Sequence, residues 1–221
     1  MPILASNTAP NTTDPGDDLL EAHFDSGRIV GTHVQTLDNG ITVGLFGLVG
    51  DGAARITTAV APASFEEAQL AAADAVETLQ AQDVDIIIAL SHSGVGTEEL
   101  EGEDEAMAAA IPGIDVIVSG HSHTALSEPV MVGDTIIVQA GAYTKYLGEL
   151  TVVRDEDGWA VEAYTLHPLN DDIPGDAVVT EQVDGFIDAL NEGPLADMGT
   201  SFSEPIFSIG GFFVRLRIPL I

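Results

Sequence analysis

Residues 113–124 read GIDVIVSGHSHT: a short apolar run, a glycine, and then His121 and His123, separated by one residue. Its apolar part, IDVIV, favours a strand buried on both faces, as in a parallel sheet, because it is a short continuous run rich in β-branched residues. Residues 84–92, VDIIIALSH, repeat the pattern with an isoleucine-rich run that ends in His92. The two runs therefore predict neighbouring buried strands that are each followed by histidine.

The sequence around these runs predicts alternating strands and helices. Residues 64–82 are expected to form a helix that opens with Ser64 and Glu67 as a capping box. Residues 41–50 predict another buried strand, whereas residues 5–27, rich in Asn, Thr, Asp, Pro and Gly, predict a polar loop. The alternation of strand and helix indicates an α/β layered domain.

The end of the chain changes character after Leu166. Residues 147–166 predict a β-hairpin, which implies a mixed sheet or two packed sheets. A linker-like stretch and an amphipathic helix follow, and then the apolar residues 209–221. Two alternatives stay open for this last stretch: the truncated start of a second domain, or sequence outside the reading frame.

The charge balance excludes several classes of partner. The chain of 221 residues contains 36 acidic and six basic residues, for a net charge of −30, which argues against nucleic acid and against an anionic membrane surface. It has no cysteine, so disulfides and thiolate sites are excluded. No signal peptide is visible at residues 1–10, and no apolar run approaches the ~18 residues of a membrane-spanning helix.

Three of the six histidines are candidate metal ligands. The carboxyl ends of parallel strands lie at one edge of a sheet, where open α/β sheets bind ligands, so His92, His121 and His123 are expected to converge. Three imidazoles suit zinc, manganese, iron or similar ions. A single histidine after a strand is more often an ordinary hydrogen-bonded residue, and that alternative applies to the other three histidines.

Other catalytic patterns are missing from the sequence. There is no G-x-S-x-G elbow, no cysteine nucleophile and no P-loop, and no residue is assigned as catalytic. The acidic run from Glu98 to Glu105 is expected to be mostly a solvated face. Within it, Asp104 is the candidate for a carboxylate that orients a histidine from behind the ligands.

Over residues 1–168 the sequence resembles the calcineurin-like metallophosphoesterases, and more closely their 5′-nucleotidase branch. The matching stretches follow one another in order: PILASN (2–7), VGLFGLVG (43–50), DIIIALSHSG (85–94), an aspartate before an alanine-rich helix (Asp104), GIDVIVSGHSHT (113–124) and IIVQAGAYTKYLGEL (136–150). The resemblance implies a four-layer α/β/β/α sandwich with mixed sheets and two divalent metal ions, zinc, manganese or similar. It implies that His92 and His121 bind one ion and His123 the other.

The resemblance also implies a function. The family hydrolyses phosphate esters, often nucleoside 5′-monophosphates, with a water activated between two metal ions. Relatives act on cyclic nucleotides, sugar nucleotides or sulfur esters. A periplasmic, secreted or cell-surface location is implied by the resemblance alone.

The sequence departs from the family pattern in its metal ligands. The Asp-x-His and Gly-Asn-His motifs that precede PILASN in the family occur nowhere in this chain. Residues 1–168 are therefore expected to be the C-terminal half of the catalytic domain, and residues 169–221 a linker helix and the truncated start of a second domain. We expect the chain alone to be inactive or nearly so. The competing hypotheses are a protein that binds metal without turnover and a remnant without function.

Overall fold

The computed structural model describes residues 2–97, 102–156, 158–204, 208–209 and 212–213. The chain forms two compact units, Met1–Pro168 and Leu169–Ile221. The first unit holds a six-stranded sheet whose strands run in the order β4-β5-β7-β8-β10-β9. In that order the bounds are Thr32–Thr36, Thr42–Val49, Ile86–His92, Val116–Val118, Thr135–Val138 and Val130–Val132.

The four inner strands β5, β7, β8 and β10 are parallel, whereas the two edge strands are antiparallel to their neighbours. The predicted buried strands are confirmed: Ile87, Ala89 and Ile117 are at most 4 % exposed. The register aligns Leu90 of β7 with Val118 of β8, so both strands end at the same edge of the sheet.

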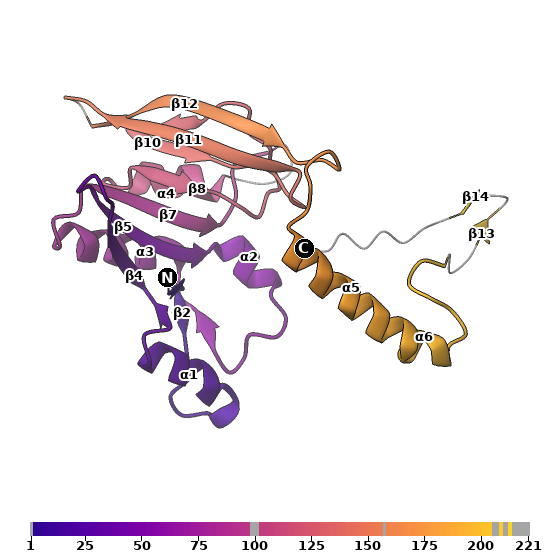
Figure 1. The fold of residues 1–221 in the computed structure, drawn as a ribbon. Coiled ribbons are helices and arrows are strands. Elements are labelled where there is room, and N and C mark those ends of the chain that lie inside the picture. Colours follow the sequence, from indigo (N-terminus) through magenta and orange to yellow (C-terminus); the bar gives the residue numbers. More distant parts are fainter. Residues whose placement is uncertain (1, 98–101, 157, 205–207, 210–211, 214–221) are drawn as a thin grey trace. The chain divides into compact units, whose positions relative to one another are not determined.

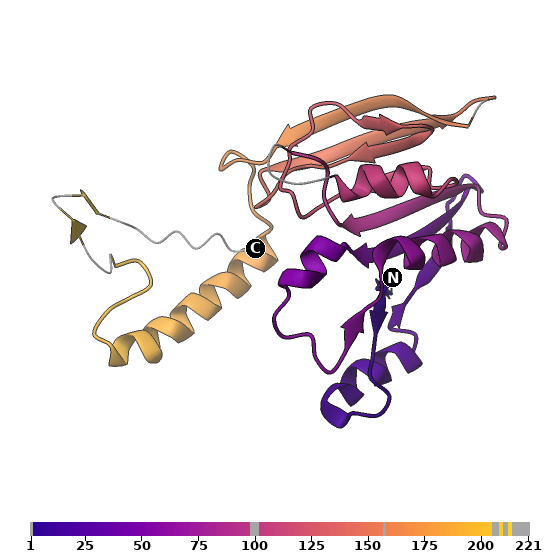
Figure 2. The same cartoon turned by 180° about the vertical axis from the view of Figure 1, so that it is seen from behind.

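Each face of this sheet carries a different layer (Figures 1 and 2). Helices α3 (Ala68–Gln80) and α4 (Glu103–Ala110) bury alanine, valine, leucine and methionine side chains against one face. The predicted hairpin, β11 (Tyr146–Arg154) and β12 (Trp159–Pro168), packs on the other face. The mixed α/β fold is thereby confirmed, with a helical layer, a six-stranded sheet and a two-stranded layer; the fourth layer of the sandwich stays a prediction.

The capping box at Ser64 is wrong. Ser64–Phe65 forms strand β6, which pairs antiparallel with β2 (Thr8–Ala9), and helix α3 begins only at Ala68. The side chain of Asp51, at the start of α2 (Asp51–Ile56), accepts the hydrogen bond from Ala68 N instead. A partner distant in sequence therefore caps the helix.

The predicted polar loop over residues 5–27 is also wrong in part. It contains the short 3-10 helix η1 (Pro15–Asp17) and helix α1 (Asp18–Asp25). Asp14 accepts a hydrogen bond from Gly16 N, so residues that suggested a loop act as a helix cap. On either side, β1 (Ile3–Leu4) pairs in parallel with β3 (Ile29–Val30).

The second unit contains the predicted amphipathic helix as α5 (Ala177–Glu192), which the Asp176 side chain caps through Val178 N and Val179 N. Helix α6 (Pro194–Asp197) and the short pair β13 (Ser208–Ile209) and β14 (Phe212–Phe213) follow. Most of residues 209–221 lies outside the described residues. Its assignment to a second domain stays a prediction.

Candidate metal-binding site

The carboxyl edge of the parallel strands gathers the three predicted histidines. His92 is the last residue of β7, and His121 and His123 lie in the loop that follows β8. This loop stays close to its neighbours because Ser119 N donates to Val138 O of β10. Strand order brings His92 and His121 into contact, whereas the ring contact of His123 is with Tyr143, so the predicted set of three metal ligands stays a prediction.

His92 and His121 are in direct ring contact. Their ring centroids lie 5.1 Å apart at an interplanar angle of 63°. Gly120 lies close to the His92 ring, since a Cβ there would be only 3.1 Å from His92 Nδ1. His121 has φ 67° and His123 has φ 56°, in the left-handed region that non-glycine residues seldom adopt. Such backbone is concentrated at functional sites, where the surroundings hold it in place.

The pKa of His92 is lowered below its ordinary value of 6.5. Burial is the largest cause, followed by the positive charges that His121 and His123 would carry, whereas the nearby Asp104 acts in the opposite direction. A lowered pKa keeps the imidazole neutral near pH 7, which is the form that binds a metal ion.

Asp104 lies beneath this edge and is fully buried. Its carboxylate accepts hydrogen bonds from Ser91 Oγ at 2.6 Å and from Gly94 N at 3.2 Å. Burial raises the pKa of Asp104, against the opposing effect of hydrogen bonds from Ser119, Ser91 and Gly94. The carboxylate thus bonds the turn on either side of His92, and it acts on the His92 ring through its charge.

The loop after β10 contributes residues that the sequence analysis did not single out. The Tyr143 ring lies 5.2 Å from the His123 ring between centroids, and Lys145 Nζ lies 6.0 Å from the Tyr143 centroid. Tyr143 and Thr144 also have positive φ. In the sequence analysis these residues appear only as part of the stretch 136–150 that resembles the family. Nothing in their own spacing indicates that they lie near a histidine.

The donor set fits part of a metal site. Within the described ranges, no three or more His, Cys, Asp or Glu side chains form a group that could hold a metal ion. His92 and His121 supply two adjacent nitrogen donors, while His123 is turned toward Tyr143. The other histidines lie on α1, β4 and β12, and His167 Nε2 is 2.7 Å from Glu149 Oε2.

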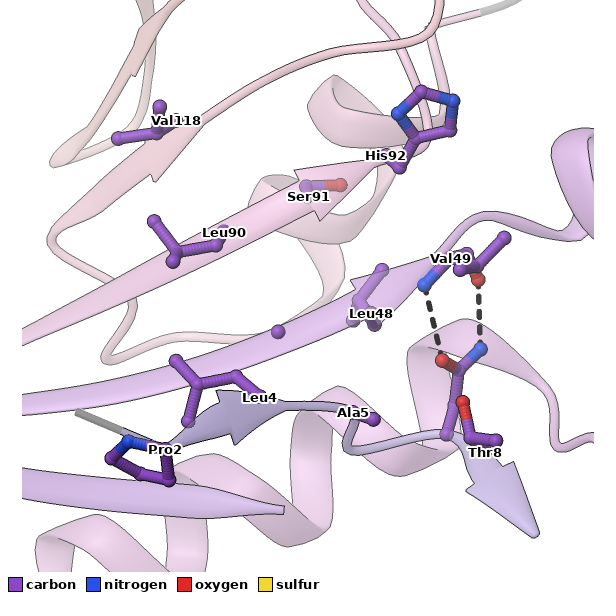
Figure 3. A pocket seen from close by; sticks show the side chains of 12 residues that line it. Pro2, Leu4, Ala5, Thr8, Leu48, Val49, Leu90, Ser91, His92 and Val118 are labelled. Atoms are coloured by element: carbon purple, nitrogen blue, oxygen red, sulfur yellow. Dashed lines mark hydrogen bonds between the residues drawn. The ribbon is translucent and has the colours of Figure 1, made fainter. Parts of the chain in front are cut away.

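A pocket of about 400 Å³ opens beside His92 (Figure 3). Pro2, Leu4, Ala5 and Thr8 form one wall, and Leu90, Val118 and His92 lie on the other side. Leu90 and Val118 are 39 % and 42 % exposed, and their side chains give the pocket apolar surface. The pocket is therefore mostly apolar, and it ends at the polar imidazole of His92. This combination suits a ligand with one apolar and one charged or polar end.

Comparison with known proteins relates the chain to phosphoesterases. Residues 19–125 match the family "Calcineurin-like phosphoesterase". The chain is 29 % identical to mouse 5′-nucleotidase over 198 residues, which is 80 % of this chain and 33 % of that protein. It is 39 % identical to the snake venom 5′-nucleotidase of Macrovipera lebetinus over 120 residues, 45 % of this chain and 28 % of that protein.

A solved structure shares the fold. The 5′-nucleotidase precursor from Thermus thermophilus superposes with a TM-score of 0.65 and 26 % sequence identity, over 86 % of this chain and 38 % of its own length. The chain spans about a third or less of the length of the curated relatives named above.

Proposed function

We propose that the chain takes part in the metal-dependent hydrolysis of phosphate esters, because residues 19–125 match the family of calcineurin-like phosphoesterases. Phosphoesterases of this family use divalent metal ions. The observation that carries the proposal is the contact between the His92 and His121 rings at the carboxyl edge of the sheet. Nucleoside 5′-monophosphates are the proposed substrates, because the relatives named above are 5′-nucleotidases.

The histidines have distinct roles in this proposal. His92 and His121 hold one divalent ion, zinc, manganese or similar, and His123 contributes to a second. Bound ions supply Lewis-acid polarisation of the phosphate and a more acidic water. The chain's own contribution is to keep the His92 imidazole neutral through burial, and to fix the turn around it through Asp104.

The pocket beside His92 is the proposed place for the ester. Its apolar walls exclude water from one side of the ligand, and its histidine end lies where the phosphate is expected. Lys145, one of six basic residues in a chain of net charge −30, lies in the same cluster of loops through its contact with Tyr143. A cation there offsets part of the repulsion between an acidic protein and an anionic substrate.

A complete two-metal site needs more ligands than the three imidazoles provide. We therefore propose that the 221-residue chain alone turns over little or no substrate, and that the whole activity depends on carboxylate and Asn-His ligands from outside it. The test is to express this chain and to assay AMP hydrolysis with added manganese or zinc. Rapid turnover by the chain alone would refute the proposed dependence on further ligands.

Metal binding without turnover is the second candidate function. It is favoured by the contact between the His92 and His121 rings, which supplies two adjacent nitrogen donors without a catalytic carboxylate. Calorimetric titration with zinc distinguishes a hydrolase or a metal-binding protein from a remnant without function. Zinc binding that is lost in His121→Asn supports a role for the metal. AMP hydrolysis by a longer chain that includes the missing ligands then distinguishes the hydrolase from the binding protein.

A secreted, periplasmic or cell-surface location is proposed from the relatives, one of which is a venom protein. Among the described residues, no helix combines the length and apolar character needed to cross a bilayer. The partner in this proposal is a small phosphate ester rather than nucleic acid, because the net charge of −30 disfavours a phosphate backbone.

A further inference from the structure

Gln139 is a buried polar residue that the proposed chemistry does not use. It directly follows strand β10, and only 1 % of its surface is exposed. A buried amide needs hydrogen-bond partners, since an unpaired polar group costs free energy when it leaves water. The partners of this side chain lie in the loop that carries His121 and His123.

The Gln139 side chain bonds two residues of this loop. Its Oε1 accepts hydrogen bonds from Ser122 Oγ at 2.9 Å and from Thr124 N at 3.2 Å. Ser122 lies between the two histidines, and Thr124 follows the second. A single acceptor atom thus holds the loop at positions adjacent to both left-handed histidines.

The same network reaches the turn after His92. Ser122 Oγ, which donates to Gln139, accepts a hydrogen bond from Val95 N at 3.2 Å. A Cβ on Gly94 would lie 3.2 Å from Ser122 Cβ, so the two loops are also packed closely. Gln139 therefore acts through Ser122 on the relative placement of the loops that carry His92 and His121.

The other half of the amide argues against a role in stability alone. Thr124 N–H can only donate, so the oxygen of Gln139 must face the loop, and Nε2 is left buried without a partner among the described residues. An apolar side chain of the same length would remove that unpaired donor. What favours an amide at position 139 is therefore its oxygen, which accepts the hydrogen bonds from Ser122 and Thr124 in the loop of His121 and His123.

We infer that Gln139 is a positioning residue, which sets the geometry of His121 and His123 through Ser122 and Thr124. The inference rests on the proposed function only where it concerns the effect of Gln139 on metal affinity. The effect of Gln139 on the positions of the imidazoles does not depend on any metal. Substitution of groups that orient metal ligands typically weakens metal binding by about 10–100-fold.

The test compares Gln139→Met, which has similar length and no acceptor, with Gln139→Glu, which keeps an acceptor oxygen. Long-range ¹H–¹⁵N spectra of the imidazoles are recorded on the full metal-free chain, together with zinc affinity and thermal unfolding. We expect Gln139→Met to shift the His121 and His123 signals and to weaken zinc binding about tenfold or more. Gln139→Glu should restore the signals toward the wild type.

The matched control is Thr135→Val, at the opposite end of β10. Thr135 is also buried, and its Oγ1 donates to Ile114 O at 2.8 Å. This variant should lower the unfolding temperature and leave the imidazole signals unchanged. A wild-type imidazole spectrum in Gln139→Met, or equal shifts in Thr135→Val, would overturn the inference.

Two further outcomes remain decisive. If Gln139→Met does not fold, Ser122→Ala removes the hydroxyl that links the loops, and unchanged His121 signals in it overturn the inference. If the wild-type chain binds no zinc, the metal role proposed above fails, while the metal-free imidazole spectra still decide whether Gln139 positions the histidines.

Discussion

Replacement of Asn7 by alanine is expected to destabilise the first unit strongly. Asn7 is 1 % exposed and makes three hydrogen bonds to backbone groups. Its Nδ2 donates to Val49 O at 2.7 Å and to Glu66 O at 3.2 Å, and its Oδ1 accepts from Val49 N at 3.0 Å. These bonds attach residues 2–9 to the end of β5 and to the segment before α3, at a wall of the pocket beside His92.

The magnitude follows from the number of bonds and from the access of water. Each hydrogen bond contributes about 1 kcal/mol net, so the loss of three costs ~3 kcal/mol. Water from the adjacent open pocket can reach some of the freed groups, so the cost stays below that of three fully buried unpaired groups. For a unit of this size, ~3 kcal/mol corresponds to a fall in unfolding temperature of roughly 6–12 °C.

The assay is urea unfolding followed by circular dichroism, with thermal unfolding as a second measurement. Asn39→Ala is the matched control, because Asn39 lies in an exposed turn and its Oδ1 accepts only from Ile41 N, at 3.1 Å. The control should cost no more than about 0.5 kcal/mol, as surface substitutions usually do. If Asn7→Ala and Asn39→Ala unfold at the same urea concentration, the role given to the Asn7 bonds is refuted.

Three further predictions concern pH, salt and metal. Burial raises the pKa of Asp115, so its contribution to stability is present at low pH and is lost as pH rises through that raised pKa. In urea unfolding, the stability of Asp115→Asn should therefore match that of the wild type near pH 3 and exceed it at pH 7. An equal difference in stability at both pH values would contradict this. The net charge of −30 should make the unfolding temperature rise with salt up to about 1 M, where the screening length is about 3 Å, and a flat salt dependence in calorimetry would contradict this. His121→Asn should abolish zinc binding in calorimetric titration, whereas His33→Asn, on edge strand β4, should leave it intact; a loss in both variants would point to nonspecific binding.

The sequence predicts the centre of the fold better than its periphery. The runs before His92 and His121 are apolar on both faces, and this property dictates burial between two layers without knowledge of any partner. Their parallel arrangement brings both histidines to one edge, so the proximity of His92 and His121 could be expected from the sequence. In both strands, the local sequence pattern is enough to predict the burial of the strand and the position of its histidine.

The errors share a physical cause in bonds between residues far apart in sequence. Ser64 matched a capping box, yet its backbone pairs with Ala9, and Asp51 caps helix α3 instead. Gln139 and Tyr143 likewise reach the site through contacts with Ser122 and His123. A local pattern cannot reveal such partners, because the competing choices differ only in their tertiary contacts.

The distribution of buried polar side chains supports the carboxyl edge as the site. Four such residues gather near the ends of β7 and β10: Ser91, Ser93, Asp104 and Gln139. Burial of a polar group lowers stability unless its bonds are satisfied, and apolar residues would fill the same space at less cost. At this edge the polar groups bond the turns that carry His92, His121 and His123, two of which have left-handed backbone. A requirement for stability alone does not account for both features at one edge, whereas a requirement to hold three imidazoles in place accounts for both.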